Sequence, residues 1–191
     1  MIPGDALTIE PLRGSFLHQM NSPQELLIDY ERGGVALNDS SQGLSVQLWS
    51  TAYEDDVVYA VEESGARHTL FSRPGITELS LAFYQSAAPF VAFVDAGGAT
   101  FWWFNPNTAQ HEFFPYLPPT ISGIRCTLDD SRPLSATTND IVVAYLRNGN
   151  LCARVQRENF ANEKVLAENA GSRLIQLGMN TVLRLQFRAR P

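Results

Sequence analysis

The sequence contains few of the residues and motifs from which catalytic and metal sites are built. Only two of its 191 residues are cysteine and three are histidine. His18, His68 and His111 each lack a second histidine or cysteine at metal-ligand spacing. The Gly-x-Ser-x-Gly turn of hydrolases and the glycine-rich phosphate loop are also missing. We therefore expect no enzyme activity, no catalytic residues, no cofactor and no metal site.

Positive charge is also scarce, with 14 Lys and Arg residues against 20 Asp and Glu residues, for a net charge of −6. Nucleic-acid binding depends on cations that replace counterions along the phosphates, so we expect no nucleic-acid partner. No apolar run approaches the roughly 20 residues that span a bilayer, so we expect no membrane span. The first residues lack the basic and apolar regions of a signal peptide, and we expect synthesis in the cytoplasm.

The two cysteines, Cys126 and Cys152, are too few for a disulfide framework. Both lie in segments that have the pattern of β-strands, where a buried thiol behaves as a small hydrophobic group. A disulfide between them requires that their strands be neighbours. Burial as free thiols is the preferred interpretation.

Two pairs of adjacent carboxylates, Asp55-Asp56 and Asp129-Asp130, raise the question of glycoside hydrolysis, which uses two opposed carboxylates. Adjacent residues on a strand point to opposite faces, so neither pair converges on one substrate. Each pair precedes an expected hairpin, and aspartate favours turns. We interpret both pairs as turn residues, with calcium binding or acid catalysis as the alternative.

What the sequence does contain is one β-hairpin pattern in three copies, at residues 57–71, 91–104 and 143–155. In each copy a glycine follows an alanine by five positions: Ala60 and Gly65, Ala92 and Gly97, Ala144 and Gly149. Glycine adopts positive φ without steric cost, which suits the turn of a hairpin. We predict that the three alanines occupy equivalent strand positions and that the three glycines lie in the turns that follow.

Further strand patterns surround these hairpins. A leading strand is expected at 44–49, 78–83 and 124–128, a fourth strand at 113–116 and 164–167, and a terminal hairpin at 173–187. Four antiparallel strands form a propeller blade, but propellers close with four to eight blades. We predict an all-β fold with about three repeated antiparallel units plus a terminal hairpin, arranged as a propeller or a sandwich. Another chain is a third way to complete the ring or sheet.

The first 42 residues lack this hairpin pattern, so we predict an N-terminal arm at 1–42 and a β-repeat domain at 43–191. Ser22 and Pro23 are typical of a helix start, and Gly33-Gly34 would end that helix. The helix either packs on the sheet, or the arm reaches a neighbouring subunit. Apolar residues of the arm need a partner surface and are interface candidates: Leu12, Phe16, Leu17, Leu26 and Leu27.

The densest aromatic segment, Phe101-Trp102-Trp103-Phe104, supplies four more interface candidates. On a strand its rings alternate between faces, so we expect one face in the core and the other at a subunit contact. Stacking on a carbohydrate or on nucleic-acid bases is the alternative.

Several short segments occur in an order that resembles small β-rich virion structural proteins of tailed bacteriophages, usually tail-associated. These segments are Tyr30–Asp39, Gly43–Trp49, Ile76–Glu78, Phe90–Val94, Asp140–Tyr145, Gly149–Leu151, Gln156–Phe160, Gly178–Asn180 and Arg184–Phe187. The chain departs from the family at Cys152, where an aromatic residue is expected, and its aromatic strand is bulkier than usual. The resemblance implies a virion component and transfers no catalytic residue.

The expected function is therefore a structural component of a tailed-bacteriophage virion that acts through assembly contacts. Its partners would be copies of itself and other tail or head–tail proteins. It would be made in the cytoplasm of the host bacterium and located in the virion. The alternative is a carbohydrate-binding module of a receptor-binding apparatus, which would bind a host-surface glycan. A glycan-processing enzyme is the weaker alternative.

Overall fold

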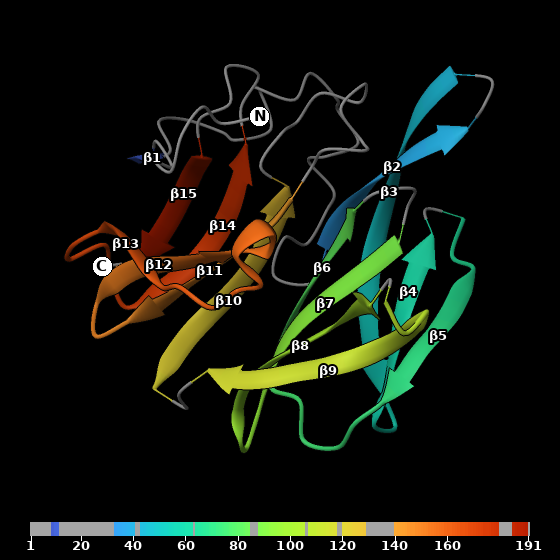
Figure 1. Ribbon diagram of the computed structural model, residues 1–191, viewed down its shortest axis with the longest axis horizontal. Coiled ribbons are helices and arrows are strands. Elements are labelled where there is room, and N and C mark those ends of the chain that lie inside the picture. Colours follow the sequence, from blue (N-terminus) through green and yellow to red (C-terminus); the bar gives the residue numbers. More distant parts are fainter. Residues whose placement is uncertain are drawn as a thin grey trace.

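The fold is described from a computed structural model, which confirms the prediction that the chain is all-β. The description covers residues 9–11, 33–40, 43–62, 64–84, 88–105, 107–117, 120–128, 140–179 and 185–190. In these parts the strands form three four-stranded sheets and one three-stranded sheet (Figure 1).

Each four-stranded sheet is an antiparallel meander of consecutive strands. The first sheet contains β2 (Gly33–Ser40), β3 (Gly43–Glu54), β4 (Val57–Glu62) and β5 (Arg67–Ser72). The second contains β6 (Glu78–Tyr84), β7 (Ala88–Asp95), β8 (Gly98–Asn105) and β9 (Gln110–Leu117). The third contains β10 (Ile121–Leu128), β11 (Ile141–Arg147), β12 (Asn150–Val155) and β13 (Lys164–Ala167).

The terminal sheet joins the two ends of the chain. It contains the hairpin of β14 (Arg173–Met179) and β15 (Leu185–Arg190), and β1 (Ile9–Pro11) pairs in parallel with β15. The predicted terminal hairpin is therefore present, and a segment of the predicted arm extends its sheet.

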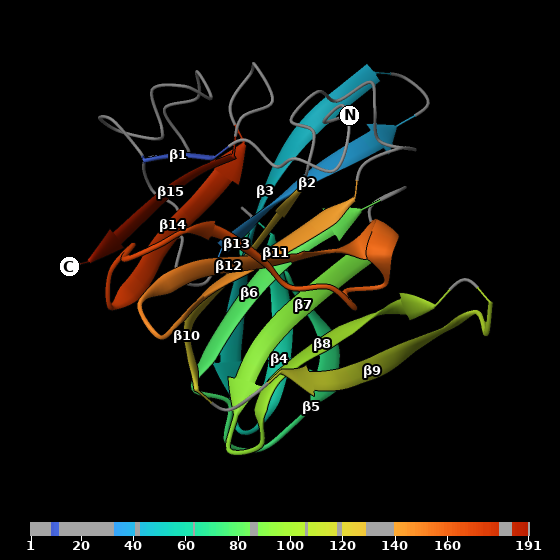
Figure 2. The same cartoon turned by 60° about the vertical axis from the view of Figure 1, so that its left-hand side comes forward.

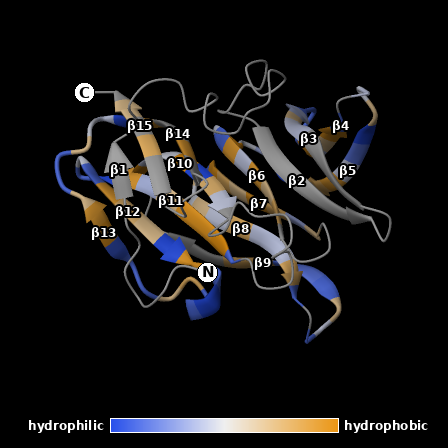
Figure 3. Cartoon of the chain, turned by 90° about the horizontal axis from the view of Figure 1, so that it is seen from above, coloured by the Kyte–Doolittle hydropathy of each residue, from blue (hydrophilic) through white to orange (hydrophobic). Residues whose placement is uncertain are grey.

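The sheets stack face to face in chain order, as neighbouring blades of a propeller do (Figures 1 and 3). The first strands β2, β6, β10 and β14 contact one another in succession. One hydrophobic cluster lies between the first and second sheets, another between the second and third, and another between the third and terminal sheets. The last strands β5, β9 and β13 form the opposite edges of their sheets, which we call the outer edges.

Strand β7 shows why a strand of the second sheet has a continuous run of apolar residues in its sequence. Val91 and Phe93 contribute to the cluster against the first sheet, whereas Phe90 and Ala92 contribute to the cluster against the third. Adjacent residues point to opposite faces of a strand, so a sheet that is covered on both sides needs apolar residues at every position.

The first strands of neighbouring sheets are joined by side chains instead of a strand ladder. Glu78 on β6 accepts a hydrogen bond from the backbone N–H of Ile124 on β10, at 2.9 Å, and Ser80 Oγ accepts one from the N–H of Cys126, at 3.0 Å. Residues 78 and 80 lie on one face of β6, as do residues 124 and 126 on β10. These bonds satisfy backbone donors that an edge strand would otherwise leave unpaired.

Strands β10 and β14 approach each other closely at Gly123 on β10, which has a φ of +63°. A Cβ atom at this position would lie 2.6 Å from the backbone nitrogen of Leu174 on β14. The glycine is therefore required both by its backbone conformation and by the space available.

The predicted equivalence of the three alanines holds for two of them. Ala92 and Ala144 lie on the second strands of their sheets, at the same distance from two-residue turns. Ala60 lies on β4, the third strand of the first sheet, and Thr51 is the residue at the corresponding position of the second strand. The alanine–glycine spacing selected the β4–β5 hairpin instead of the equivalent β3–β4 hairpin, because the β3–β4 turn contains no glycine. Asp55 and Asp56 form it instead, with φ of +50° and +61°.

The predicted domain boundary at residue 42 falls inside the first sheet. Strand β2 lies in the predicted arm, yet it pairs with β3 from Gly33–Ser50 to Ser40–Gly43. Gly33 and Gly34, expected to end a helix, are the first residues of this strand. The predicted helix itself lies outside the described residues.

Both cysteines are buried and free, as the preferred interpretation held. Cys126 lies on β10 and Cys152 on β12, and β11 separates these two strands in the third sheet. The Cys126 thiol donates a hydrogen bond to Ser80 Oγ at 3.3 Å. Burial raises the pKa of Cys126 to about 12, so this thiol is protonated at neutral pH.

Candidate functional site

Most of the predicted aromatic contact segment is inside the molecule. The exposed fractions of Phe101, Trp102 and Trp103 are 2 %, 6 % and 8 %. Phe101 and Trp103 pack toward the third sheet and Trp102 packs toward the first, because β8 is covered on both faces. These three residues therefore do not offer a surface to a partner, a glycan or a base. Phe104, the fourth candidate, is partly exposed.

The interface candidates of the arm are not placed by the structure. Leu12, Phe16, Leu17, Leu26 and Leu27 lie outside the described residues, and their contact role stays a prediction.

The hairpin of β8 and β9 projects from the body of the molecule, as Figure 2 shows. Phe104 lies near its tip and pairs across the strands with His111. The centroids of the Phe104 and His111 rings are 5.3 Å apart. The His111 ring also stacks on Trp102, with the ring centroids 4.2 Å apart. Partial burial lowers the pKa of His111, which favours the neutral ring at physiological pH.

Side-chain hydrogen bonds link residues close to the tip of this hairpin. Glu112 accepts hydrogen bonds from the Asn105 amide at 2.9 Å and from the Thr108 hydroxyl at 2.5 Å. The Asn105 side chain in turn accepts a hydrogen bond from the N–H of Asn107 at 3.0 Å. The two bonds that Glu112 accepts lower its pKa, so it stays ionised at neutral pH. These hydrogen bonds restrict the side chains and backbone of the hairpin next to its tip.

The outer strand of the hairpin carries an exposed aromatic residue. Phe113 on β9 is 48 % exposed, although its ring makes an edge-to-face contact with the ring of Phe71, with the centroids 5.3 Å apart. Among the described strands, β9 pairs with β8 alone. An edge strand of this kind can accept another strand through its backbone groups.

The remaining candidates from the sequence have structural roles where the structure describes them. His68 forms an exposed hydrogen bond with Glu62 at 2.7 Å, and its ring lies against Trp49 with the ring centroids 5.4 Å apart. Asp55 and Asp56 form a turn, as interpreted from the sequence, and Asp56 accepts a hydrogen bond from the Tyr53 hydroxyl at 2.7 Å. His18 and the Asp129-Asp130 pair lie outside the described residues. Within the described residues, no three His, Cys, Asp or Glu side chains are grouped as a metal site would require.

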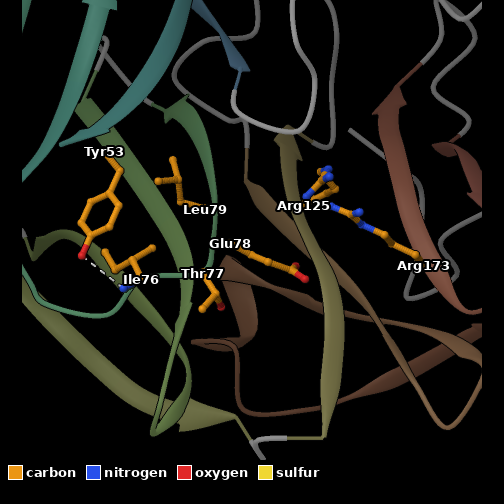
Figure 4. Close-up of a pocket in the computed structure, with 7 residues that line it drawn as sticks. All are labelled: Tyr53, Ile76, Thr77, Glu78, Leu79, Arg125 and Arg173. Atoms are coloured by element: carbon orange, nitrogen blue, oxygen red, sulfur yellow. Dashed lines mark hydrogen bonds between the residues drawn. The ribbon is translucent and has the colours of Figure 1, made fainter. Parts of the chain in front are cut away.

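A polar pocket of about 170 Å³ lies where the first strands converge, and we call it the axial pocket (Figure 4). Its lining comes from β3, the loop before β6, and strands β6, β10 and β14: Tyr53, Ile76, Thr77, Glu78, Leu79, Arg125 and Arg173. The side chain of Arg173 extends toward Arg125, and the Glu78 carboxylate points into the space beside them (Figure 4). Three sheets therefore contribute charged groups to one hollow.

Hydrogen bonds position Arg125 and Tyr53 in the wall of the axial pocket. Arg125 is 4 % exposed and donates a hydrogen bond to the carbonyl of Ile124 at 2.6 Å. Tyr53 accepts a hydrogen bond from the N–H of Ile76 at 3.3 Å. Its own hydrogen bond to Asp56 raises the pKa of Tyr53, so the phenol stays neutral.

Sequence reasoning did not find this pocket, because its residues are brought together from positions 53 to 173. One signal was present: Arg125 stands between Ile124 and Cys126 in a strand that the sequence marks as buried. A charged residue at a buried position needs a partner or a ligand.

Comparisons with known proteins identify no relative, since no family model, curated protein or solved structure matches this chain. In the described part of the chain, no helix is long and apolar enough to cross a membrane.

Proposed function

We propose that this protein is a structural component of a tailed-bacteriophage virion, associated with the tail, and that it works through contacts between copies of itself and with neighbouring tail proteins. The observation that carries this proposal is the projecting β8–β9 hairpin. It extends past the body, side-chain hydrogen bonds link residues next to its tip, and its outer strand pairs with β8 alone among the described strands.

The chemistry of the hairpin suits a protein contact. Phe104 and Phe113 present apolar ring surface next to backbone groups that can pair with another strand. Aromatic residues are enriched in protein interfaces, and an element restricted by such hydrogen bonds loses less conformational entropy on binding. The order of short segments along the chain, which resembles that of tail-associated virion proteins, supports the same function.

Val165 is the other exposed large apolar side chain among the described residues, and it is a weaker candidate for a protein contact. Val165 on β13 is 55 % exposed, but single exposed apolar residues are common on protein surfaces. No projecting element accompanies it, since β13 is a four-residue strand beside β12. Val165 therefore serves as a control position.

Quantitative mass spectrometry of purified particles tests the proposal. Particles of the phage that encodes this chain should contain the protein in many copies, after washing in high salt removes loosely bound proteins. Its presence in the infected cell but absence from particles would contradict the proposal. Retention of a monomer on a polysaccharide column, together with that absence, would favour the carbohydrate-binding alternative.

A further inference from the structure

We propose that the connection between β12 and β13 is a strained strap that opens as a unit while the sheets stay folded, and that its opening exposes the buried thiol of Cys152. The strap comprises residues 156–163 and begins with the short 3-10 helix η3 (Gln156–Glu158). This inference concerns a movement within one chain and is independent of the assembly function, because the strap is not part of the projecting hairpin.

The backbone of the strap has two successive residues in the left-handed region. Asn159 has a φ of +50° and Phe160 has a φ of +55°. Asparagine tolerates this conformation, but a bulky aromatic residue rarely adopts it, and the surrounding structure has to hold it there. The closed strap therefore stores strain that opening would release, since an open segment can return to an ordinary φ.

The side chain of Phe160 is the first of the contacts that hold the strap closed. Its ring is buried in the hydrophobic cluster between the second and third sheets. The centroid of this ring lies 5.4 Å from that of Phe90, 5.0 Å from that of Phe101 and 5.9 Å from that of Trp103. A strained residue is thus the anchor of the strap, because its ring packs against the aromatic core.

Side chains of the third sheet supply further contacts to the strap. Arg154 on β12 donates hydrogen bonds to the carbonyl of Phe160 at 2.6 Å and to that of Ala161 at 2.9 Å. Its Nε donates to the hydroxyl of Tyr145 on β11 at 3.1 Å, and that hydroxyl donates to Glu163 at 2.6 Å. One connected network therefore ties the middle and the end of the strap to two strands.

Cys152 lies beside the end of the strap. It pairs with Tyr145 across β11 and β12 and is 1 % exposed. Burial and then the neighbouring Glu163 carboxylate raise the pKa of the Cys152 thiol, which places this thiol next to the last residue of the strap. Cys126 is covered elsewhere, where its thiol contacts Ser80 on β6. Movement of the strap should therefore uncover one cysteine and leave the other buried.

Alkylation of the full chain by iodoacetamide tests the strap, with peptide mass spectrometry to locate each modified thiol. A segment that opens locally exposes little surface, so its opening responds weakly to urea, whereas global unfolding responds strongly. Each rate is divided by the rate of the same thiol in the unfolded chain. In low urea we expect Cys152 to be alkylated at least about tenfold faster than Cys126. The rate at Cys152 should change little with urea, and the rate at Cys126 should rise steeply.

Three variants connect the alkylation rate to the strap. Arg154→Lys keeps the positive charge but loses the guanidinium N–H groups that reach the two carbonyls, so it should speed alkylation of Cys152 at least about tenfold. Tyr145→Phe removes the hydroxyl to which Arg154 also donates, and it should act in the same direction. Arg67→Lys, at an exposed ion pair on the first sheet, should change neither rate.

Each result decides for or against the strap. Equal rates at Cys152 and Cys126 with the same urea dependence would overturn the proposal, because both thiols would then be exposed by global unfolding alone. Arg154→Lys and Tyr145→Phe chains that remain folded by circular dichroism and leave the rate at Cys152 unchanged would overturn it as well, and so would an equal acceleration at both thiols. If neither variant folds, the comparison of the two thiols in the wild-type chain decides.

Discussion

The second and third sheets differ from the first in how many of their faces are buried. On β7 and β11 a continuous run of residues is fully buried, because neighbouring sheets cover both faces. On β4, Val58 and Ala60 are buried while Val57, Tyr59 and Val61 are half-buried. On β5, only Phe71 is buried, and Arg67 forms an exposed ion pair with Glu54.

The same sequence pattern therefore has two meanings, set by the position of a sheet in the stack. A continuous apolar run marks a strand with a sheet on each side, and an alternating run marks a strand with a core on one side. It follows that equal substitutions should have unequal effects in the two regions.

The largest difference is expected between two glycines with positive φ. Gly123→Ala places a Cβ atom 2.6 Å from the backbone of Leu174, whereas a Cβ atom at Gly65, in the β4–β5 loop, meets nothing within 4 Å. We expect Gly123→Ala to lower the free energy of unfolding by about 3 kcal/mol or more, from combined backbone strain and overlap. Gly65→Ala should cost only about 1 kcal/mol, the strain of its φ alone.

Urea unfolding of the two variants measures this difference. Equal losses of stability at positions 123 and 65 would mean that β10 and β14 are not in close contact.

A pair of valines compares the two kinds of sheet directly. Val143 on β11 is fully buried, and Val57 on β4 is half-buried. Val143→Ala should destabilise the fold by about 2 kcal/mol, because it removes two methyl groups from a packed core. Val57→Ala should cost less than about 1 kcal/mol, since water already reaches part of this side chain. Guanidinium-chloride unfolding checks both, and equal losses would contradict the one-sided burial of the first sheet.

Two serines test the hydrogen bonds between first strands. Ser80→Ala removes the acceptor for the Cys126 N–H and leaves that donor buried, which should cost about 1 to 2 kcal/mol. Ser72→Ala removes an exposed bond from its hydroxyl to the Asp56 carbonyl, which water can replace. We expect the melting temperature to fall for Ser80→Ala and to stay nearly constant for Ser72→Ala. The reverse order would show that β6 and β10 are not joined in this way.

The smallest expected effect is the contribution of the Cys126 thiol to the pH dependence of stability. Because burial raises the pKa of Cys126 above its ordinary value near 9, the contribution of this thiol to stability is complete below pH 9. It declines as the pH rises toward about 12, where the folded-state thiol ionises. Between pH 8 and 10, the stability of the wild-type chain should fall more steeply than that of Cys126→Ala. Parallel curves would contradict the burial of this thiol.

The sequence was sufficient to predict the architecture where local pattern decides it. The all-β class, the strands at 113–116 and 164–167 and the glycine turns at Gly97 and Gly149 follow from periodicity and turn chemistry. The first sheet was misassigned because aspartates replace glycine in the β3–β4 turn. Asp tolerates the left-handed conformation, so the Asp55-Asp56 pair was the signal that could have located β3–β4 as a hairpin.

Local periodicity and turn residues do not predict which strands pair when they are far apart in the sequence. Strand β1 is three residues long and pairs in parallel with β15, which lies about the whole chain away. The axial pocket likewise depends on the contact between β10 and β14. The sequence alone could not predict that Trp102 and Trp103 are both buried, because it does not show that neighbouring sheets cover both faces of β8.

The most direct test of the assembly function is the copy number of a hairpin variant in purified particles, with the variant supplied in place of the wild-type protein. Phe104→Asp places a charge on the projecting hairpin, and Val165→Asp places one on the exposed edge strand β13. Circular dichroism should show both variants folded. We expect Phe104→Asp to reduce incorporation at least about tenfold, as burying an unpaired charge in an interface does. Val165→Asp should be incorporated as the wild type is, and normal incorporation of Phe104→Asp would contradict the account.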